Sequence, residues 1–166
     1  MSPIVRALIV FAAGALMAPL ALAQSGATSL KEGQASGTLV HKGKSVKLAH
    51  AYVFVDEKDS RKPVILYLTD KPLPADKWKS GTDLMMYRGS NKFSGVGFWL
   101  DPKEKYGDFR NEVCVECDFP TSTSGIFNVK LDGAPGKAFA GKVTVSTGSS
   151  MAKDFQLDGA FNAKLK

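Results

Sequence analysis

Two strongly apolar segments joined by a short charged loop constrain the fold of this chain more than any other feature. The first spans residues 48–55 and the second residues 64–69, and most residues of the loop at 56–62 are charged. Both segments are apolar at consecutive positions and rich in β-branched and aromatic residues, which is typical of strands covered on both faces. We therefore predict a β-hairpin over 48–74 that occupies the centre of a sheet.

The remainder of the chain consists of short strand patterns separated by turn residues. Further strands are predicted at 36–40, 84–87, 93–100, 113–119, 126–131, 139–145 and 155–165. One helical turn is predicted at 75–79, with a break at Gly81. About seven to nine short strands without a long helical pattern favour an all-β fold with at most one short helix. We expect a single antiparallel β-sandwich, with a β-barrel as the alternative.

The first 23 residues have the pattern of a secretory signal peptide. Arg6 is their only charged residue, an apolar run spans 7–22, and small residues precede the expected cleavage point. A membrane anchor is the alternative, but it needs about 20 apolar residues and a basic flank, which this run lacks. We therefore predict an exported protein, periplasmic or secreted, without a transmembrane segment after cleavage. A polar, flexible leader is expected at 24–35 and a single β-domain at 36–166.

The charge pattern argues against a nucleic-acid partner. The formal net charge is +6, but lysines alternate with acidic residues, as at 56–59 and 101–105. Arginine is the residue best suited to bidentate phosphate recognition, and beyond the signal peptide the chain has only Arg61, Arg88 and Arg110. The pattern indicates a solvated lysine surface.

Short motifs in these strands resemble a loose group of uncharacterised exported bacterial all-β proteins. The motifs are His50-Ala51-Tyr52 in the first apolar segment, the sequence LTDKPL at 68–73, and the alternating strand at 155–165. The resemblance implies an exported all-β domain of bacterial origin. It implies no activity, and it assigns no role to any residue.

Cys114 and Cys117 are the sharpest chemical feature, and a C-x-x-C pair has several interpretations. Covalent haem attachment requires a histidine directly after the pair, where Asp118 stands instead. A redox pair usually begins a helix, whose dipole lowers a thiol pKa, but these cysteines lie in a strand pattern beside acidic residues. A zinc site needs two further ligands. The metal alternative would therefore combine both cysteines with His50.

Strand geometry adds a constraint on this pair. Residues three apart in a regular strand are separated by about 10 Å, whereas a disulfide needs Cα atoms within roughly 7 Å. Either the strand breaks into a turn or bulge at 115–116, or the thiols stay separate. Export and an even cysteine count favour a structural disulfide; unpaired thiols, metal binding and redox catalysis are the alternatives. A bridge that closes so small a loop should contribute little to stability.

Five residues are candidates for ligand binding. His50 can serve as a metal ligand or a general base, or it can be a satisfied sheet histidine beside Tyr52. Asp70 precedes Lys71-Pro72 and is most simply a turn residue. Trp78 and Trp99 can form an aromatic recognition patch or cover the core.

The motifs favour a binding protein over an enzyme. The sequence contains no Ser-His-Asp pattern, phosphate loop or helical zinc motif, so we predict no catalytic residues and no cofactor. The favoured function is a non-catalytic exported β-domain that binds a protein or small ligand in the bacterial envelope. The first alternative is a metal-binding or redox protein that uses Cys114 and Cys117, with His50 as a further ligand. The second is a structural component associated with the envelope.

Overall fold

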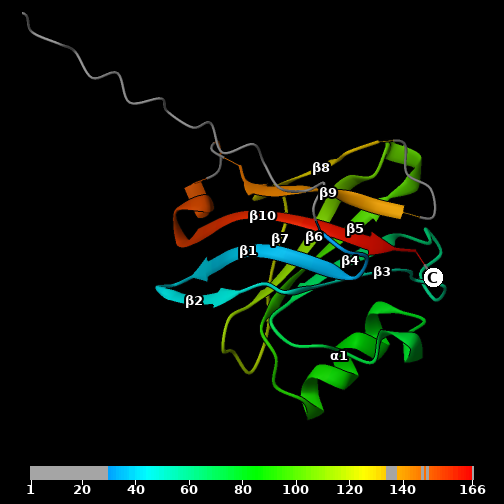
Figure 1. The fold of residues 1–166 in the computed structure, drawn as a ribbon, viewed down its shortest axis with the longest axis horizontal. Coiled ribbons are helices and arrows are strands. Elements are labelled where there is room, and N and C mark those ends of the chain that lie inside the picture. Colours follow the sequence, from blue (N-terminus) through cyan, green and yellow to red (C-terminus); the bar gives the residue numbers. More distant parts are fainter. Residues whose placement is uncertain (1–29, 134–137, 147, 149, 166) are drawn as a thin grey trace, which may run out of the picture.

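The computed structural model describes residues 30–133, 138–146, 148 and 150–165, and Figure 1 shows their arrangement. Nine strands follow one another in a single antiparallel sheet, in the order β7-β6-β5-β4-β3-β1-β10-β9-β8, and β2 pairs with β1 outside this path. The sheet curls into a half-barrel. The strands are β1 (Gln34–His41), β2 (Lys44–Lys47), β3 (His50–Val55), β4 (Val64–Thr69), β5 (Gly95–Asp101), β6 (Gly107–Cys114), β7 (Thr121–Thr123), β8 (Phe127–Leu131), β9 (Ala138–Val145) and β10 (Phe155–Lys164). The helical elements are α1 (Gly81–Ser90) and the short 3₁₀ helices η2 (Ala75–Lys77), η3 (Pro102–Glu104) and η4 (Ser150–Asp154).

The predicted central hairpin is confirmed. Strands β3 and β4 pair in an antiparallel register that sets His50 opposite Thr69 and Val55 opposite Val64. All six residues of β4 are buried. Because β3 has β1 as its other neighbour and β4 has β5, the hairpin lies in the middle of the sheet.

The two faces of the central strands are covered by different parts of the molecule. On the inner face, Leu66 and Leu68 join the core of the half-barrel, together with phenylalanines from β5, β8, β9 and β10. On the outer face, Ile65 and Tyr67 pack beneath α1 and the segments that flank it. The remaining buried members of this outer cluster are Phe54, Trp78, Leu84, Phe93 and Trp99. The continuous apolar pattern of β4 therefore reflects two hydrophobic layers rather than one.

The strand predicted at 84–87 is wrong, because these residues belong to helix α1. The Ser80 hydroxyl caps the helix by accepting the Asp83 N–H at 3.2 Å, and Asp56 Oδ2 accepts the Gly81 N–H at 2.9 Å. The break predicted at Gly81 is therefore wrong, because this residue begins the helix. Leu84 and Arg88, four residues apart, face the sheet and are buried. A short apolar run cannot by itself distinguish a strand from a helix.

Most of the other predicted strands are present. The structure confirms those at 36–40, 93–100, 126–131, 139–145 and 155–165 as β1, β5, β8, β9 and β10. The strand predicted at 113–119 ends at Cys114 but begins earlier, at Gly107. Its first half was missed because residues 107–112 are mainly polar and alternate poorly. The short strands β2 and β7 were also missed.

The predicted signal peptide, residues 1–23, lies outside the described residues. Strand β1 begins at Gln34, inside the segment predicted as leader. None of the helices in the described part of the chain is long and apolar enough to cross a membrane.

Candidate functional site

A disulfide joins Cys114, the last residue of β6, to Cys117, with 5.4 Å between their Cα atoms. The strand ends there and the chain turns through Glu116, whose φ is 47°. The break at 115–116 is one of the two outcomes that strand geometry allowed, and the structure shows the one that pairs the cysteines. The thiols are therefore not separate in this structure.

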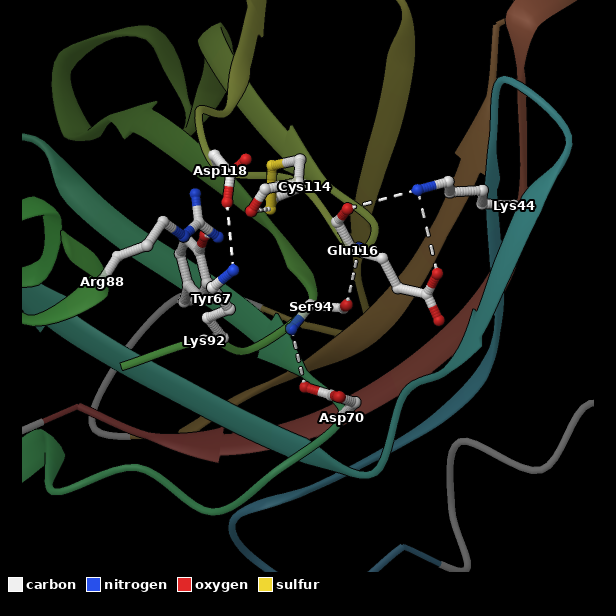
Figure 2. Close-up of a disulfide and its surroundings, with 10 residues drawn as sticks. Lys44, Tyr67, Asp70, Arg88, Lys92, Ser94, Cys114, Glu116 and Asp118 are labelled. Atoms are coloured by element: carbon white, nitrogen blue, oxygen red, sulfur yellow. Dashed lines mark hydrogen bonds and ion pairs between the residues drawn. A yellow bond between two sulfur atoms is a disulfide. The ribbon is translucent and has the colours of Figure 1, made fainter. Parts of the chain in front are cut away.

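A cleft of about 320 Å³ opens beside this disulfide (Figure 2). Its walls are Val46, Asp70, Lys71, Lys92, Phe93, Ser94, Glu116, Cys117 and Asp118, which we call the disulfide cleft. The cleft lies between β2, which pairs with β1 outside the main strand order, and the disulfide turn. Strand β3 pairs with β4 only from His50 onward, and β4 ends at Thr69, opposite His50. Among the described strands, β2 pairs with β1 alone, and Lys44 and Val46 place it across from the disulfide turn.

Asp70, Ser94 and Glu116 form a chain of hydrogen bonds along the cleft (Figure 2). Asp70 Oδ1 accepts the Ser94 N–H at 2.9 Å, and the Ser94 carbonyl oxygen accepts the Asp70 N–H at 3.1 Å. The Ser94 hydroxyl in turn accepts the Glu116 N–H at 3.0 Å. Asp70 therefore does more than form a turn: it ties the end of β4 to the segment before β5. Together with the disulfide, these bonds fix the shape of the cleft.

Charges of both signs border the cleft. Lys44 Nζ lies 3.4 Å from the Glu116 carbonyl oxygen and 3.9 Å from Glu116 Oε2. Lys92 Nζ lies 3.2 Å from Asp118 Oδ1. Each of these side chains is at least half exposed, so the ion pairs contribute about 0–1 kcal/mol each. Both pairs can open to bind a charged ligand at little cost.

A buried polar pair lies behind the cleft, on the outer face of the sheet. Arg88 of α1 is 8% exposed and donates a hydrogen bond to the Tyr67 hydroxyl. Its guanidinium also lies 4.8 Å from the centre of the Phe93 ring, and Figure 2 shows it beside Tyr67. Burial raises the pKa of Tyr67 well above its usual value. Tyr67 therefore stays protonated, and its hydrogen bond with Arg88 links α1 to β4.

Three of the candidates predicted from the sequence lie together beneath α1 and its flanks. The rings of His50 and Tyr52 stack with centroids 6.5 Å apart, and Trp78 meets Tyr52 edge-on at 6.1 Å. The Tyr52 hydroxyl accepts the Leu73 N–H at 2.7 Å, and burial raises the pKa of Tyr52. Trp78 and Trp99 are 6% and 4% exposed. The structure thus places both tryptophans in the core and not in an exposed recognition patch.

The metal alternative does not fit the register of the sheet. His50, Thr69, Gly95 and Cys114 are successive partners across β3, β4, β5 and β6. Three inter-strand steps separate His50 from Cys114 by about 14 Å, which is too far for two ligands of one ion. Among the described residues, no group of three or more His, Cys, Asp or Glu side chains is arranged to hold a metal ion.

Comparisons of this chain with known protein families, with characterised proteins and with solved structures gave no significant match.

Proposed function

We propose that the protein is an exported, non-catalytic binding domain that holds a small charged ligand in the disulfide cleft. The observation that carries this proposal is the cleft itself, about 320 Å³ in volume and bordered by a disulfide and a hydrogen-bonded chain. Ligand pockets of proteins start at about 300 Å³, so this volume suits a ligand of the size of an amino acid or a short peptide. A site with fixed walls loses little conformational entropy when it binds.

The charges indicate what kind of ligand would fit. Lys71 and Lys92 offer ammonium groups at the cleft, and Glu116 and Asp118 offer carboxylates. A ligand with both an amino and a carboxyl group, such as an amino acid or a short peptide, could pair with both signs at once. We therefore propose a zwitterionic ligand.

Binding can be tested with a panel of free amino acids and dipeptides and their N-acetylated or amidated derivatives, by isothermal titration calorimetry. Lys71→Trp would fill part of the cleft, and Lys77→Trp, at another exposed lysine on η2, is the matched control. We expect the zwitterions to bind the wild type and Lys77→Trp, and their capped derivatives and Lys71→Trp to bind at least tenfold more weakly. Equal binding to Lys71→Trp would place the site elsewhere. Turnover of a bound ligand would contradict the non-catalytic proposal.

We also propose that the protein acts outside the cytoplasm, in the periplasm or secreted. A disulfide persists in such oxidising compartments, and it supports this proposal together with the signal pattern at 1–23. Mass spectrometry of the protein from periplasmic and culture fractions would test it. We expect a chain that begins at Gln24 and is lighter by two hydrogens than its reduced form. A full-length chain in the cytoplasmic fraction would contradict it.

A redox role is the second candidate, because the two cysteines differ in access. Cys114 is fully buried, whereas Cys117 is half-buried and borders the cleft. An external thiolate could attack Cys117 Sγ, break the S–S bond and leave the electron pair on Cys114 Sγ. A second external thiolate would then attack the external sulfur of this mixed disulfide, which releases the product as a disulfide, leaves Cys117 as a thiolate and leaves the protein reduced by two electrons. Cys114→Ala should trap the mixed disulfide with glutathione on Cys117. If no such adduct forms from oxidised glutathione, the redox candidate fails.

For the architecture, we infer the barrel alternative. Strands β6 and β8, which are not hydrogen-bonded neighbours, approach each other across the open side of the curled sheet. This contact supports a barrel with an unpaired seam over two separate facing sheets.

A further inference from the structure

Three buried oxygens lie together on the inner side of β6 and β7, away from the disulfide cleft. They are Asp108 Oδ1, Asn111 Oδ1 and Thr123 Oγ1, and none has a hydrogen-bond partner among the described residues. In the described part of the chain, no other buried side-chain oxygen lacks one. Buried polar atoms are normally satisfied, so three orphaned oxygens in one place call for a physical explanation.

The sheet brings these side chains together by a β-bulge. In a regular strand, Asp108 and Asn111 would point to opposite faces because they are three residues apart. The register between β5 and β6 shifts at Trp99/Leu100, so that Asp108 stands opposite Leu100 and Asn111 opposite Phe98. Leu100 and Phe98 both belong to the inner core. The extra residue therefore turns both polar side chains inward.

One hydrogen bond and one cross-strand pairing place the three residues next to one another. Asn111 Nδ2 donates a hydrogen bond to Asp108 Oδ2, which leaves the other oxygen of each group without a partner. Thr123 of β7 is the direct cross-strand partner of Asn111, so their side chains lie on the same face. Asn111 is fully buried, while Asp108 and Thr123 are half-buried, so the site lies just below the surface.

The charge of Asp108 is not balanced by a basic side chain. Within the described ranges, no lysine, arginine or histidine makes an ion pair with it. The nearby Arg110 is paired with Glu112, and both are partners of residues on the outer face, Trp99 and Gly97. A buried carboxylate is costly unless another charge compensates it.

We propose that Asp108, Asn111 and Thr123 form a binding site for a hard divalent cation of the calcium type. A carboxylate, an amide carbonyl and a hydroxyl are oxygen donors, which Ca²⁺ prefers, and its flexible coordination lets water complete the shell. Such an ion supplies both the missing positive charge and the missing partners of all three oxygens. With a single carboxylate the affinity is expected to be weak, about 10⁻⁴–10⁻³ M, as in extracellular calcium modules.

The test uses the intact mature protein, freed of metal by chelation. Calcium chloride is titrated calorimetrically, and the melting temperature is measured in calcium chloride, magnesium chloride and sodium chloride at equal ionic strength. We expect one calcium ion per chain and a melting temperature that rises with calcium more than with the other two salts. Absence of calcium binding up to 10 mM, a concentration about tenfold above the expected dissociation constant, would overturn the proposal.

Two conservative variants locate the ion. Asp108→Asn keeps the shape but removes the charge, and we expect calcium affinity to fall at least tenfold. Thr123→Val removes one oxygen, and we expect a severalfold loss. Asp132→Asn and Thr144→Val make the same changes at exposed positions and should bind as the wild type does. If Asp108→Asn fails to fold, Thr123→Val still decides: wild-type affinity in both Thr123→Val and Thr144→Val would contradict the site.

Discussion

Strands β4 and β10 belong to the same curled sheet but differ in what covers their outer faces. In β10 buried residues alternate with exposed or half-exposed ones along all ten positions. In β4 all six residues are buried, because α1 and its flanking segments cover the outer face. One strand separates the core from solvent, and the other separates two hydrophobic layers. The comparison shows that the sequence pattern of a strand records the number of its buried faces.

The outer layer also has a different chemistry from the inner one. The inner core consists almost entirely of aliphatic residues and phenylalanine. The outer layer contains tryptophan and tyrosine side chains together with Arg88 and Glu112, which are 8% and 1% exposed. Polar groups buried in this way specify a partner, because each must meet its hydrogen-bonding group. The outer layer thus fixes where α1 sits, and the inner layer supplies most of the burial.

The largest effect on the free energy of unfolding should come from a substitution on the covered outer face of β4, compared with one on the exposed outer face of β10. Ile65→Ala, at a fully buried outer position of β4, should lower the free energy of unfolding by about 2–5 kcal/mol. Gln156→Ala, at an exposed outer position of β10, should change it by less than about 0.5 kcal/mol. Urea unfolding of both variants measures the difference. Similar values would mean that α1 does not cover β4 in solution.

The next effect concerns the polar contact of the outer layer. Arg88→Met leaves the buried Tyr67 hydroxyl without its donor and should cost about 1–3 kcal/mol in unfolding free energy. Adding Tyr67→Phe should restore part of this loss, because the unpaired hydroxyl is then gone. A double-mutant cycle from urea unfolding gives the coupling. Lys92→Met, at an exposed position, is the control, and strictly additive losses for Arg88 and Tyr67 would refute the contact.

Removal of the disulfide should have a smaller and more local effect. Cys114→Ala with Cys117→Ser should cost at most about 2 kcal/mol, since the bridge closes a loop of very few residues. Hydrogen exchange should accelerate at 115–118 and remain unchanged in β10. Global unfolding of this variant would show that the bridge holds more of the fold than its loop length implies.

The smallest effect should be the pH dependence of the unfolding free energy that His41 causes. His41 is the last residue of β1 and pairs with Phe155 of β10. Burial lowers its pKa, with a further contribution from Lys42, and its ring stacks on Phe155 at 4.5 Å. As the pH falls, His41 is therefore protonated at a higher pH in the unfolded chain than in the folded protein. The stabilisation is complete above about pH 6.5 and is lost as pH falls through the lower pKa of the folded state. The urea midpoint of wild type should fall over this range, and that of His41→Phe should fall less; equal falls would rule out His41.

Much of the fold could be predicted from local pattern. Continuous apolar residues identified β3 and β4, and strict alternation identified β10 over its full length. The pattern failed at α1, where four apolar residues at 84–87 fit a strand as well as a helix. A capping signal was present in Ser80 and Asp83, but so short a helix is stabilised mainly by the sheet it packs on.

The candidate site was predictable only in part. The cysteine pair was evident from the sequence, and its spacing allowed either a break in the strand with a disulfide or two separate thiols. Asp70 was recognised as a candidate. Ser94 and Glu116 were not, because each acquires its role from a partner 22 or 24 residues away. Asp108 and Asn111 share a face only because of a β-bulge, which the sequence pattern does not predict.

The sequence by itself determined which segments become strands, because side-chain alternation and β-branched residues act over a few positions. It also determined that Cys114 and Cys117 can pair only where the strand ends. Only the tertiary structure decided which strands become neighbours, which faces α1 covers, and that β2 stands across from the disulfide turn to leave a cleft. The physical reason is range: propensity and periodicity act between adjacent residues, whereas burial, register and the partners of polar groups are set by segments far apart in the chain.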